Sequence, residues 1–165
     1  MAADTDLNPG EAQARRLEHV GTQVTALLRQ PEVAQRLQAT PGENEWSAMQ
    51  TVGHMAEMIP YWMSHCHRLM AAKSEPPQFG RTPDNTERLA GVERGATGQP
   101  DELLHSLNHE VEVAAQAIRH MSRTDWSKTG VHLRHGTMTV AEVVEQLVVA
   151  HAEEHLAQAQ AALGR

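Results

Sequence analysis

The sequence has a single cysteine, Cys66, and very few aromatic residues. One cysteine excludes a disulfide within the chain and is typical of a protein from a reducing cytosol. Aromatic residues make up only 3% of the chain, and the many alanine, leucine, valine and glutamate residues favour helices over sheets. No apolar run approaches the roughly 20 residues that a membrane-spanning helix requires. We therefore expect a helical protein that has no contact with a membrane.

Positive charge is also scarce. Lysine and arginine together number 14 against 21 aspartates and glutamates, which gives a net charge of -7 with histidines neutral. Without a basic patch, direct binding to nucleic acid is not expected. The segment from Met1 to Pro9 is acidic and polar and lacks the basic and apolar regions of a signal peptide. These features predict a cytoplasmic protein.

Four amphipathic segments predict an all-α fold. The expected helices run from about Pro9 to Gln30, from Ser47 to Ala72 across Pro60, from Pro100 to Met121, and from Thr139 to Gly164. Ser47 with Gln50 and Thr139 with Glu142 have the spacing of a capping box, which marks a helix start. We expect residues 1–8 to be a flexible terminus and residues 9–165 to form one domain, a four-helix bundle with long 2–3 and 3–4 connections.

Two connections between these helices are long. Residues 74–100 are rich in proline, glycine, threonine and charge, and predict a loop with a helical turn near Thr86 to Leu89. Residues 126–137 form the other connection, with a short extended piece from Val131 to Leu133. A loop as long as residues 74–100 in a compact domain is often functional.

Near the C-terminus, His151 and His155 stand four residues apart, so both lie on one face of the fourth helix. That face also carries an apolar stripe, which consists of Val140, Val143, Val144, Leu147 and Val148. A buried imidazole needs a partner, which is either a metal ion or a hydrogen-bonding neighbour. A zincin protease is excluded, because its HExxH motif requires glutamate where this chain has Ala152.

A second pair with the same spacing, His105 and His109, serves as an internal comparison. It lies on the side of the third helix opposite the apolar stripe. We therefore predict that His105 and His109 are surface residues, and that only the pair on the fourth helix is a candidate for metal binding.

A metal site needs a third ligand, and His54 on the second helix is the best candidate. It lies outside the main core stripe of that helix, on a second stripe with Glu57, Tyr61 and His65. The sequence allows two interpretations of this second stripe: it is a polar surface exposed to solvent, or it is the wall of a cleft that faces the fourth helix.

The order of short motifs along the chain is similar to that of a known family. These motifs are Glu45-Trp46-Ser47, His54, Asp125-Trp126, His132, Gly136, Thr139, His151 and His155. In this order and spacing the chain resembles the DinB/YfiT-like superfamily, from about Arg16 to Leu163. The resemblance implies a homodimeric four-helix bundle that holds a divalent metal ion through His54, His151 and His155. It also implies a low-molecular-weight thiol cosubstrate, because some members are transferases or isomerases that use mycothiol, bacillithiol or glutathione.

Three neutral imidazoles would leave an open position on the metal ion. Zinc or nickel is expected, and iron or manganese would also fit. Such a site can present a thiolate or activate water, and it should lose metal as the pH falls through the histidine range near 6.5. Glu57 and Glu154 lie close to the ligands in sequence and could orient a ligand ring or act as a base, although such glutamates are often plain surface charges.

The expected function is that of a divalent-metal-dependent enzyme with a small-molecule substrate. We favour a thiol-dependent S-transferase that acts on small electrophiles, with a metal-dependent hydrolase and a non-catalytic metal-binding stress-response module as alternatives. Cys66 projects onto the core stripe and is expected to be inert packing. The tryptophans at positions 46, 62 and 126 are interpreted as core anchors beside helix ends. For His132 and His135 two interpretations are open, residues that flank a cleft rim and plain polar residues of a loop.

Overall fold

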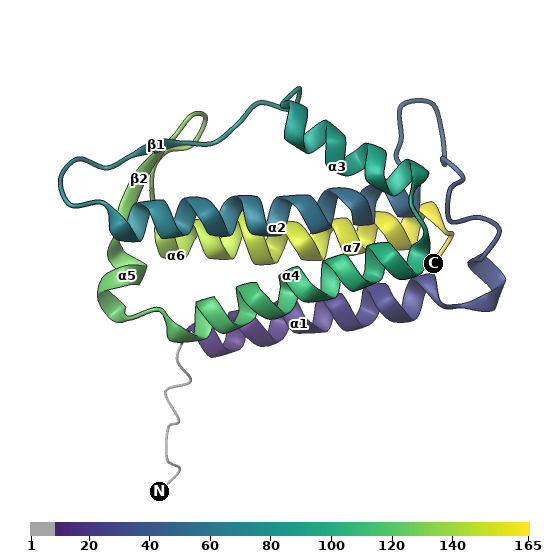
Figure 1. Cartoon of the computed structure of the whole chain (residues 1–165), viewed down its shortest axis with the longest axis horizontal. Coiled ribbons are helices and arrows are strands. Elements are labelled where there is room, and N and C mark those ends of the chain that lie inside the picture. The colour runs from purple at the N-terminus through teal and green to yellow at the C-terminus, as the bar shows by residue number, and fades with distance from the viewer. Residues whose placement is uncertain (1–8) are drawn as a thin grey trace, which may run out of the picture.

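The computed structural model describes residues 9–165, and the terminus predicted to be flexible, residues 1–8, lies outside them. Four long helices form a bundle (Figure 1): α1 (Pro9–Leu28), α2 (Ala48–Ala71), α4 (Pro100–His120), and a C-terminal helix made of α6 (Val140–Glu142), η2 (Val143–Val149) and α7 (Ala150–Ala162). Both predicted capping boxes are formed, at Ser47 and at Thr139. The prediction of an all-α four-helix bundle is confirmed.

The order of the helices around the bundle explains one long connection. Helix α1 packs against α4 and α7, and α2 also packs against α4 and α7, so α1 and α2 lie diagonally opposite each other. Helices α2 and α4 begin at the same end of the bundle and run in the same direction (Figure 1). A chain that leaves the far end of α2 must return along the whole bundle before α4 can begin, and residues 72–99 make that return.

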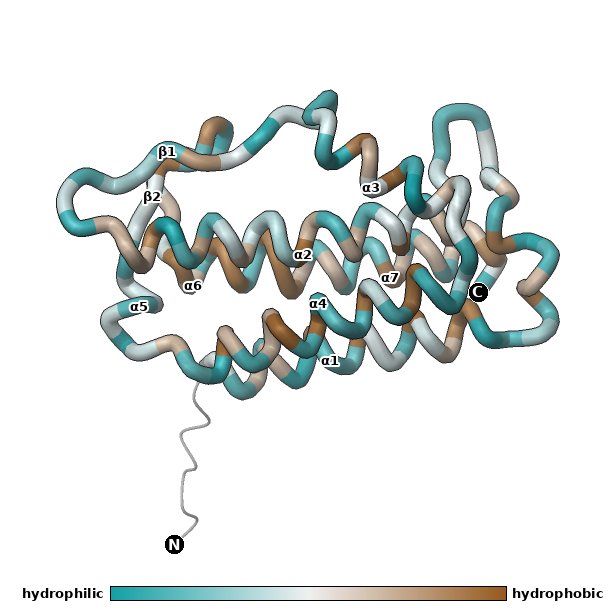
Figure 2. The backbone as a smooth tube through the Cα atoms, viewed as in Figure 1, coloured by the Kyte–Doolittle hydropathy of each residue, from teal (hydrophilic) through white to brown (hydrophobic). Residues whose placement is uncertain are grey.

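The core is formed by the apolar faces of the four long helices. Each of these helices alternates between apolar and polar residues along its length (Figure 2). The largest side chains that are completely buried include Leu17, Val24, Met55, Ile59, Leu107 and Ile118. Within residues 9–165, no helix is both long and apolar enough to span a bilayer.

The segment between α2 and α4 is more ordered than the sequence predicts. The expected single turn at Thr86 to Leu89 is a helix of 12 residues, α3 (Thr86–Thr97), and Asn85 caps its N-terminus by accepting a hydrogen bond from the backbone N–H of Arg88. Its apolar residues are too few to give a clear helical stripe, and Val92 is its one large buried apolar side chain. Helix α3 packs on α2 (Figure 1) and lies over the part of the polar stripe near Gly53 and Glu57.

Close packing of α3 on α2 depends on glycine. A side chain at Gly95 would overlap the carbonyl oxygen of Met49, and one at Gly53 would overlap the carbonyl oxygen of Gly91. We expect Gly53→Ala and Gly95→Ala each to lower the free energy of unfolding by about 1–3 kcal/mol, since both overpack a backbone contact. Urea denaturation would measure the loss, with the exposed α3 substitution Ala90→Ser as the control. Equal stability of all three variants would contradict a tight α2–α3 contact.

A small sheet closes one end of the bundle (Figure 1) and was not predicted beyond one extended piece. It has the order β1 (Gln78–Phe79), β2 (Thr129–His132) and β3 (Gly136–Thr139). Strand β1 is parallel to β2, and β2 is antiparallel to β3. The remaining elements are η1 (Pro31–Val33) and α5 (Arg123–Ser127). The sheet fixes the segment that leads from β1 into α3 against the hairpin of β2 and β3.

The C-terminal helix contains a π-helical stretch directly before its histidines. In η2 the hydrogen bonds span five residues, as when the backbone N–H of Ala150 donates to the carbonyl oxygen of Glu145. A π-helical turn holds more residues than an α-helical turn and often occurs at functional sites. A projection at a constant 100° per residue therefore does not hold between Val143 and Val149, and the register of His151 depends on this stretch.

Candidate metal centre

The structure brings together the three histidines that the sequence singles out. His54 comes from α2, and His151 and His155 come from neighbouring α7; one potential ligand atom from each ring lies within 4.8 Å of the others. The ring centroids of His151 and His155 are 4.5 Å apart, as expected for residues four apart on one helical face. His54 is 2% exposed. Of the two interpretations of its stripe, the cleft wall is therefore correct and the solvated surface is wrong.

All three imidazoles are neutral near pH 7. Burial in the protein lowers the pKa of His54 to about 2 and that of His155 to about 4, because water no longer solvates the charged form. Burial also lowers the pKa of His151. The nearby guanidinium of Arg88 adds to each shift. The cluster therefore offers three nitrogen lone pairs without the need to lose protons.

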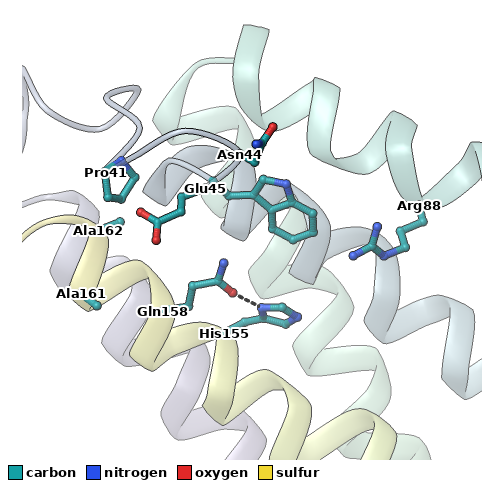
Figure 3. A pocket seen from close by; sticks show the side chains of 9 residues that line it. Pro41, Asn44, Glu45, Arg88, His155, Gln158, Ala161 and Ala162 are labelled. Atoms are coloured by element: carbon teal, nitrogen blue, oxygen red, sulfur yellow. Dashed lines mark hydrogen bonds between the residues drawn. The ribbon is translucent and has the colours of Figure 1, made fainter. Parts of the chain in front are cut away.

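Two of these rings have buried nitrogens without a partner in residues 9–165. The Nδ1–H of His155 donates to the amide oxygen of Gln158 over 2.8 Å (Figure 3), so its Nε2 carries the free lone pair. That Nε2 atom is buried and has no hydrogen bond, and the same is true of Nδ1 of His54. A buried polar atom without a partner costs about 1–3 kcal/mol. A divalent metal ion fits this donor set, because it accepts lone pairs from nitrogen ligands.

The two predicted acidic residues differ in position. The Glu57 side chain is buried, and its Oε2 lies 3.7 Å from Nδ1 of His54. The same carboxylate accepts a hydrogen bond of 2.7 Å from Arg81, and this ion pair is buried on both sides. Glu154 is exposed, and its carboxylate only raises the pKa of His155 slightly against the effect of burial. Glu57 is thus the acidic residue beside the cluster, but its carboxylate makes no hydrogen bond to His54; the predicted role of Glu154 has no contact to support it.

The tryptophans do not all serve as core anchors beside helix ends. Trp46 is half-buried and lies over the cluster, with its ring centroid 5.2 Å from that of His54 and 6.2 Å from that of His155. Trp62 is buried in the middle of α2 rather than beside its end. Trp126 is half-buried in α5. The expectation is therefore wrong for Trp46 and, in its placement, for Trp62.

Two clefts meet at His155 and Arg88. The smaller has a volume of about 190 Å³ and is lined by His54, Trp62, Arg81, Thr82, Pro83, Arg88, Arg134, His151 and His155. The larger has a volume of about 550 Å³ and is lined mainly by residues of the loop before α2 and of α7, including Trp46. Figure 3 shows Gln158 and His155 in its wall. The histidine cluster thus borders two clefts that share the side chains of His155 and Arg88.

The structure also places the single cysteine and the other histidines that the sequence analysis considered. Cys66 is buried, which confirms that it packs in the core, and burial raises the pKa of its thiol to about 12. His105 and His109 are exposed as predicted. His132 is buried between Trp62 and Phe79 rather than on an open loop, and its Nδ1 accepts hydrogen bonds from the turn that follows β2. His135 is exposed.

Sequence reasoning did not identify the arginines of the smaller cleft. Arg81, Arg88 and Arg134 come from the segment before α3, from α3 itself and from the β2–β3 turn. None of these segments has a helical stripe or a motif that marks a binding residue. The helical turn predicted at Thr86 to Leu89 includes Arg88, but nothing in that segment marks Arg88 as a residue that lines a cleft.

Comparisons with known proteins agree with this geometry. The sequence profile of the DinB superfamily matches residues 12–159. No curated protein sequence gives a significant match. Among solved structures, the chain is similar to YfiT from Bacillus subtilis, described as a probable metal-dependent hydrolase with an unusual four-helix bundle topology, with a TM-score of 0.70, 16% identity, and coverage of 98% of this chain and 90% of that chain.

A second similar structure is the mycothiol-dependent maleylpyruvate isomerase. The TM-score is 0.69 and the identity 17%, over 90% of this chain and 60% of the isomerase. A variant of that isomerase matches equally well, with a TM-score of 0.69. At such identities the structural likeness establishes the fold, and the chain spans only 60% of the isomerase's length.

Proposed function

The chain belongs to the DinB superfamily, and from that premise and the geometry of its histidines we propose that it is an enzyme dependent on a divalent metal ion. His54, His151 and His155 would hold the ion. The observation that carries this proposal is the buried Nε2 of His155, which has no partner in residues 9–165 while Nδ1 of the same ring is paired with Gln158. Zinc or nickel suits three imidazoles, and iron or manganese is compatible. Such an ion supplies a nucleophile at neutral pH by lowering the pKa of a thiol or water.

We assign the reaction to a thiol-dependent S-transferase that acts on small electrophiles. Two clefts that share His155 give a thiol cosubstrate and an electrophile separate places beside the same ring. We do not expect the chain itself to supply the thiol, because Cys66 is its single cysteine and burial raises the pKa of that thiol to about 12. With a haloalkane, the new C–S bond forms as the carbon–halogen bond breaks, halide leaves with the bonding pair, and the thiol proton passes to water. The likeness to a mycothiol-dependent enzyme supports this choice.

The residues around the cluster have supporting roles in this proposal. Gln158 holds His155 in the tautomer that presents Nε2. Arg81 holds the Glu57 carboxylate beside His54, where it favours one orientation of that ring. Trp46 covers the rings of His54 and His155 and limits the access of water to them. A dry site strengthens electrostatic interactions within it.

A metal-dependent hydrolase is the second candidate, because YfiT, which covers 98% of this chain, is described as a probable one. The same buried histidines would serve that reaction with water in place of the thiol.

A single assay separates the candidates. The metal-loaded protein is incubated with glutathione or another cellular thiol and a haloalkane or an epoxide, with and without chelator, and products are identified by mass spectrometry. We expect a thioether that chelator abolishes. A hydrolysed electrophile would favour the hydrolase, and bound metal without any product would favour a non-catalytic module.

Cys66 gives a further test of this mechanism. We expect Cys66→Ala to keep turnover within a few-fold of the original protein, because its thiol is buried in the core and has a pKa of about 12. His54→Ala should have no measurable turnover, since the metal loses a ligand. The measurement is the rate of thioether formation for each purified variant. An inactive Cys66→Ala protein beside an active His54→Ala protein would identify Cys66 as the nucleophile and exclude the metal-dependent mechanism.

A further inference from the structure

The smaller cleft carries positive charge in a chain whose net charge is -7. Three guanidinium groups, those of Arg81, Arg88 and Arg134, line a space of about 190 Å³ together with the three neutral histidines. They come from three separate segments, which the α2–α3 contact and the small sheet bring together. This concentration of one charge beside the candidate metal centre is not explained by the binding of a metal cation.

Only one of the three arginines is neutralised by the protein. Arg81 forms the buried ion pair with Glu57 and stacks over the ring of Tyr61 at 3.8 Å. Arg88 donates a hydrogen bond of 2.8 Å to the carbonyl oxygen of Pro83 and lies 5.0 Å over the Trp46 ring. Within residues 9–165 neither Arg88 nor Arg134 has a carboxylate within 4.0 Å, so two positive charges in the cleft are unpaired.

The charged form of Arg88 is disfavoured in this position. The side chain is half-buried, and burial together with the positive charge of Arg81 lowers its pKa. Its stacking over Trp46 and its bond to Pro83 nevertheless hold the guanidinium at the junction of the two clefts. An anionic group between Arg88 and Arg134 would compensate both charges, and a guanidinium binds carboxylate or phosphate through a planar pair of donors.

We infer that the smaller cleft binds an anionic small molecule, and that Arg88 and Arg134 recognise its carboxylate or phosphate group. This inference rests on the proposed function, in which the bound molecule is the electrophile. The volume of about 190 Å³ is below the roughly 300–1,000 Å³ of sites for drug-sized ligands, so the substrate is small. The larger cleft, of about 550 Å³, remains for the thiol.

Equilibrium binding tests the anion site without turnover. The metal-loaded protein and the chelator-treated protein are titrated with succinate, inorganic phosphate and the neutral analogue succinamide, and the tryptophans of the two clefts provide a fluorescence signal. We expect at least one of the two anions to bind, succinamide not to bind, and Arg88→Gln to weaken anion binding about tenfold or more. Stronger binding of succinate or of phosphate identifies the group recognised.

Arg134→Gln is the second variant, because its side chain is exposed and its loss does not threaten the fold. Arg94→Gln is the matched control, since it removes the same charge from the exposed face of α3 and does not line the smaller cleft. We expect Arg134→Gln to weaken anion binding about tenfold and Arg94→Gln to bind as the original protein does. Anion binding that is equal in all these variants, or no anion binding at all, would overturn the inference.

A turnover assay separates this inference from the proposed function. Chloroacetate and chloroacetamide have nearly the same shape and differ in charge. We expect the ratio of their kcat/KM values, chloroacetate over chloroacetamide, to fall about tenfold in Arg134→Gln and to stay unchanged in Arg94→Gln. If neither is turned over while succinate or phosphate binding still depends on Arg134, the enzyme assignment fails and the anion site stands. If both compounds are turned over and the ratio of their kcat/KM values does not change when Arg134 or Arg88 is replaced, the enzyme assignment stands and the anion site is wrong.

Discussion

Replacing His155 with alanine is expected to abolish metal binding. Its Nε2 is buried without a partner in residues 9–165, and one ligand atom of its ring lies within 4.8 Å of those of His54 and His151. Two remaining imidazoles hold a divalent ion much more weakly than three, so the purified variant should contain almost no metal where the original protein approaches one ion per chain. Elemental analysis by mass spectrometry after gel filtration would measure the metal content.

Two further variants sharpen this result. His105→Ala removes an exposed histidine from α4 and should keep the full metal content. Gln158→Ala leaves all three ligands but removes the hydrogen bond that orients His155, so the affinity should fall about 10- to 100-fold without a complete loss. Circular dichroism would show whether each variant is folded. Equal metal in His155→Ala and His105→Ala would mean that the ion, if present, is bound elsewhere.

The second large effect is a fall in the stability of the metal-free protein below pH 6.5. In the unfolded chain the histidines have a pKa near 6.5, whereas in the folded protein the pKa is about 2 for His54 and about 4 for His155. Below pH 6.5 the unfolded chain therefore binds protons that the folded protein excludes, and acid favours unfolding. Between pH 7 and pH 5 each of these two rings should cost about 2 kcal/mol of stability.

Metal binding should respond to pH differently. An ordinary exposed histidine site would lose its ion near pH 6.5, as the sequence alone suggests. Here the folded rings of His54 and His155 stay neutral down to about pH 4, so protons do not compete for them at pH 5. At a hundredfold excess over the dissociation constant, metal should add about 2.7 kcal/mol, or about 5–10 °C in Tm, at pH 7.5, and an increase in Tm should persist at pH 5.

Thermal unfolding of chelator-treated and metal-loaded protein at both pH values tests these statements together. The metal-free Tm should fall at pH 5 while the increase on adding zinc or nickel persists. His54→Ala should lose part of the pH dependence of the metal-free protein, because one of the two strongly shifted rings is gone. A metal-induced increase that is present at pH 7.5 and absent at pH 5 would show that the site titrates like exposed histidine.

Much of the architecture follows from patterns within single helices. Capping boxes at Ser47 and Thr139 depend on residues three apart, and the amphipathic stripes depend on neighbours three and four apart, so a linear sequence contains them. The same local rule distinguishes His151 and His155 from the exposed pair on α4. Cys66 falls on a core stripe and is buried, which needs no knowledge of the other helices.

The cleft depends on contacts between segments that are far apart in the chain. His54 lies on a stripe that looks polar in sequence, and it is buried because α3 and the segment before it cover that face of α2. The sequence could not show this, because α3 packs through the missing side chains of Gly53 and Gly95 rather than through an apolar stripe. The sequence predicts Trp46 in the core for a similar reason, since only the fold places its ring over the histidines.

The sequence by itself therefore determined the four long helices and the pair of histidines on one face of the last helix, and its resemblance to the superfamily added His54 as the third candidate ligand. The tertiary structure decided which charged groups surround them. Arg88 and Arg134 reach the same cleft only because the α2–α3 contact and the parallel pairing of β1 with β2 bring α3 and the β2–β3 turn to one side of the cluster. Helix periodicity and capping act over a few residues, whereas the charge of a cleft is set by the packing of distant segments.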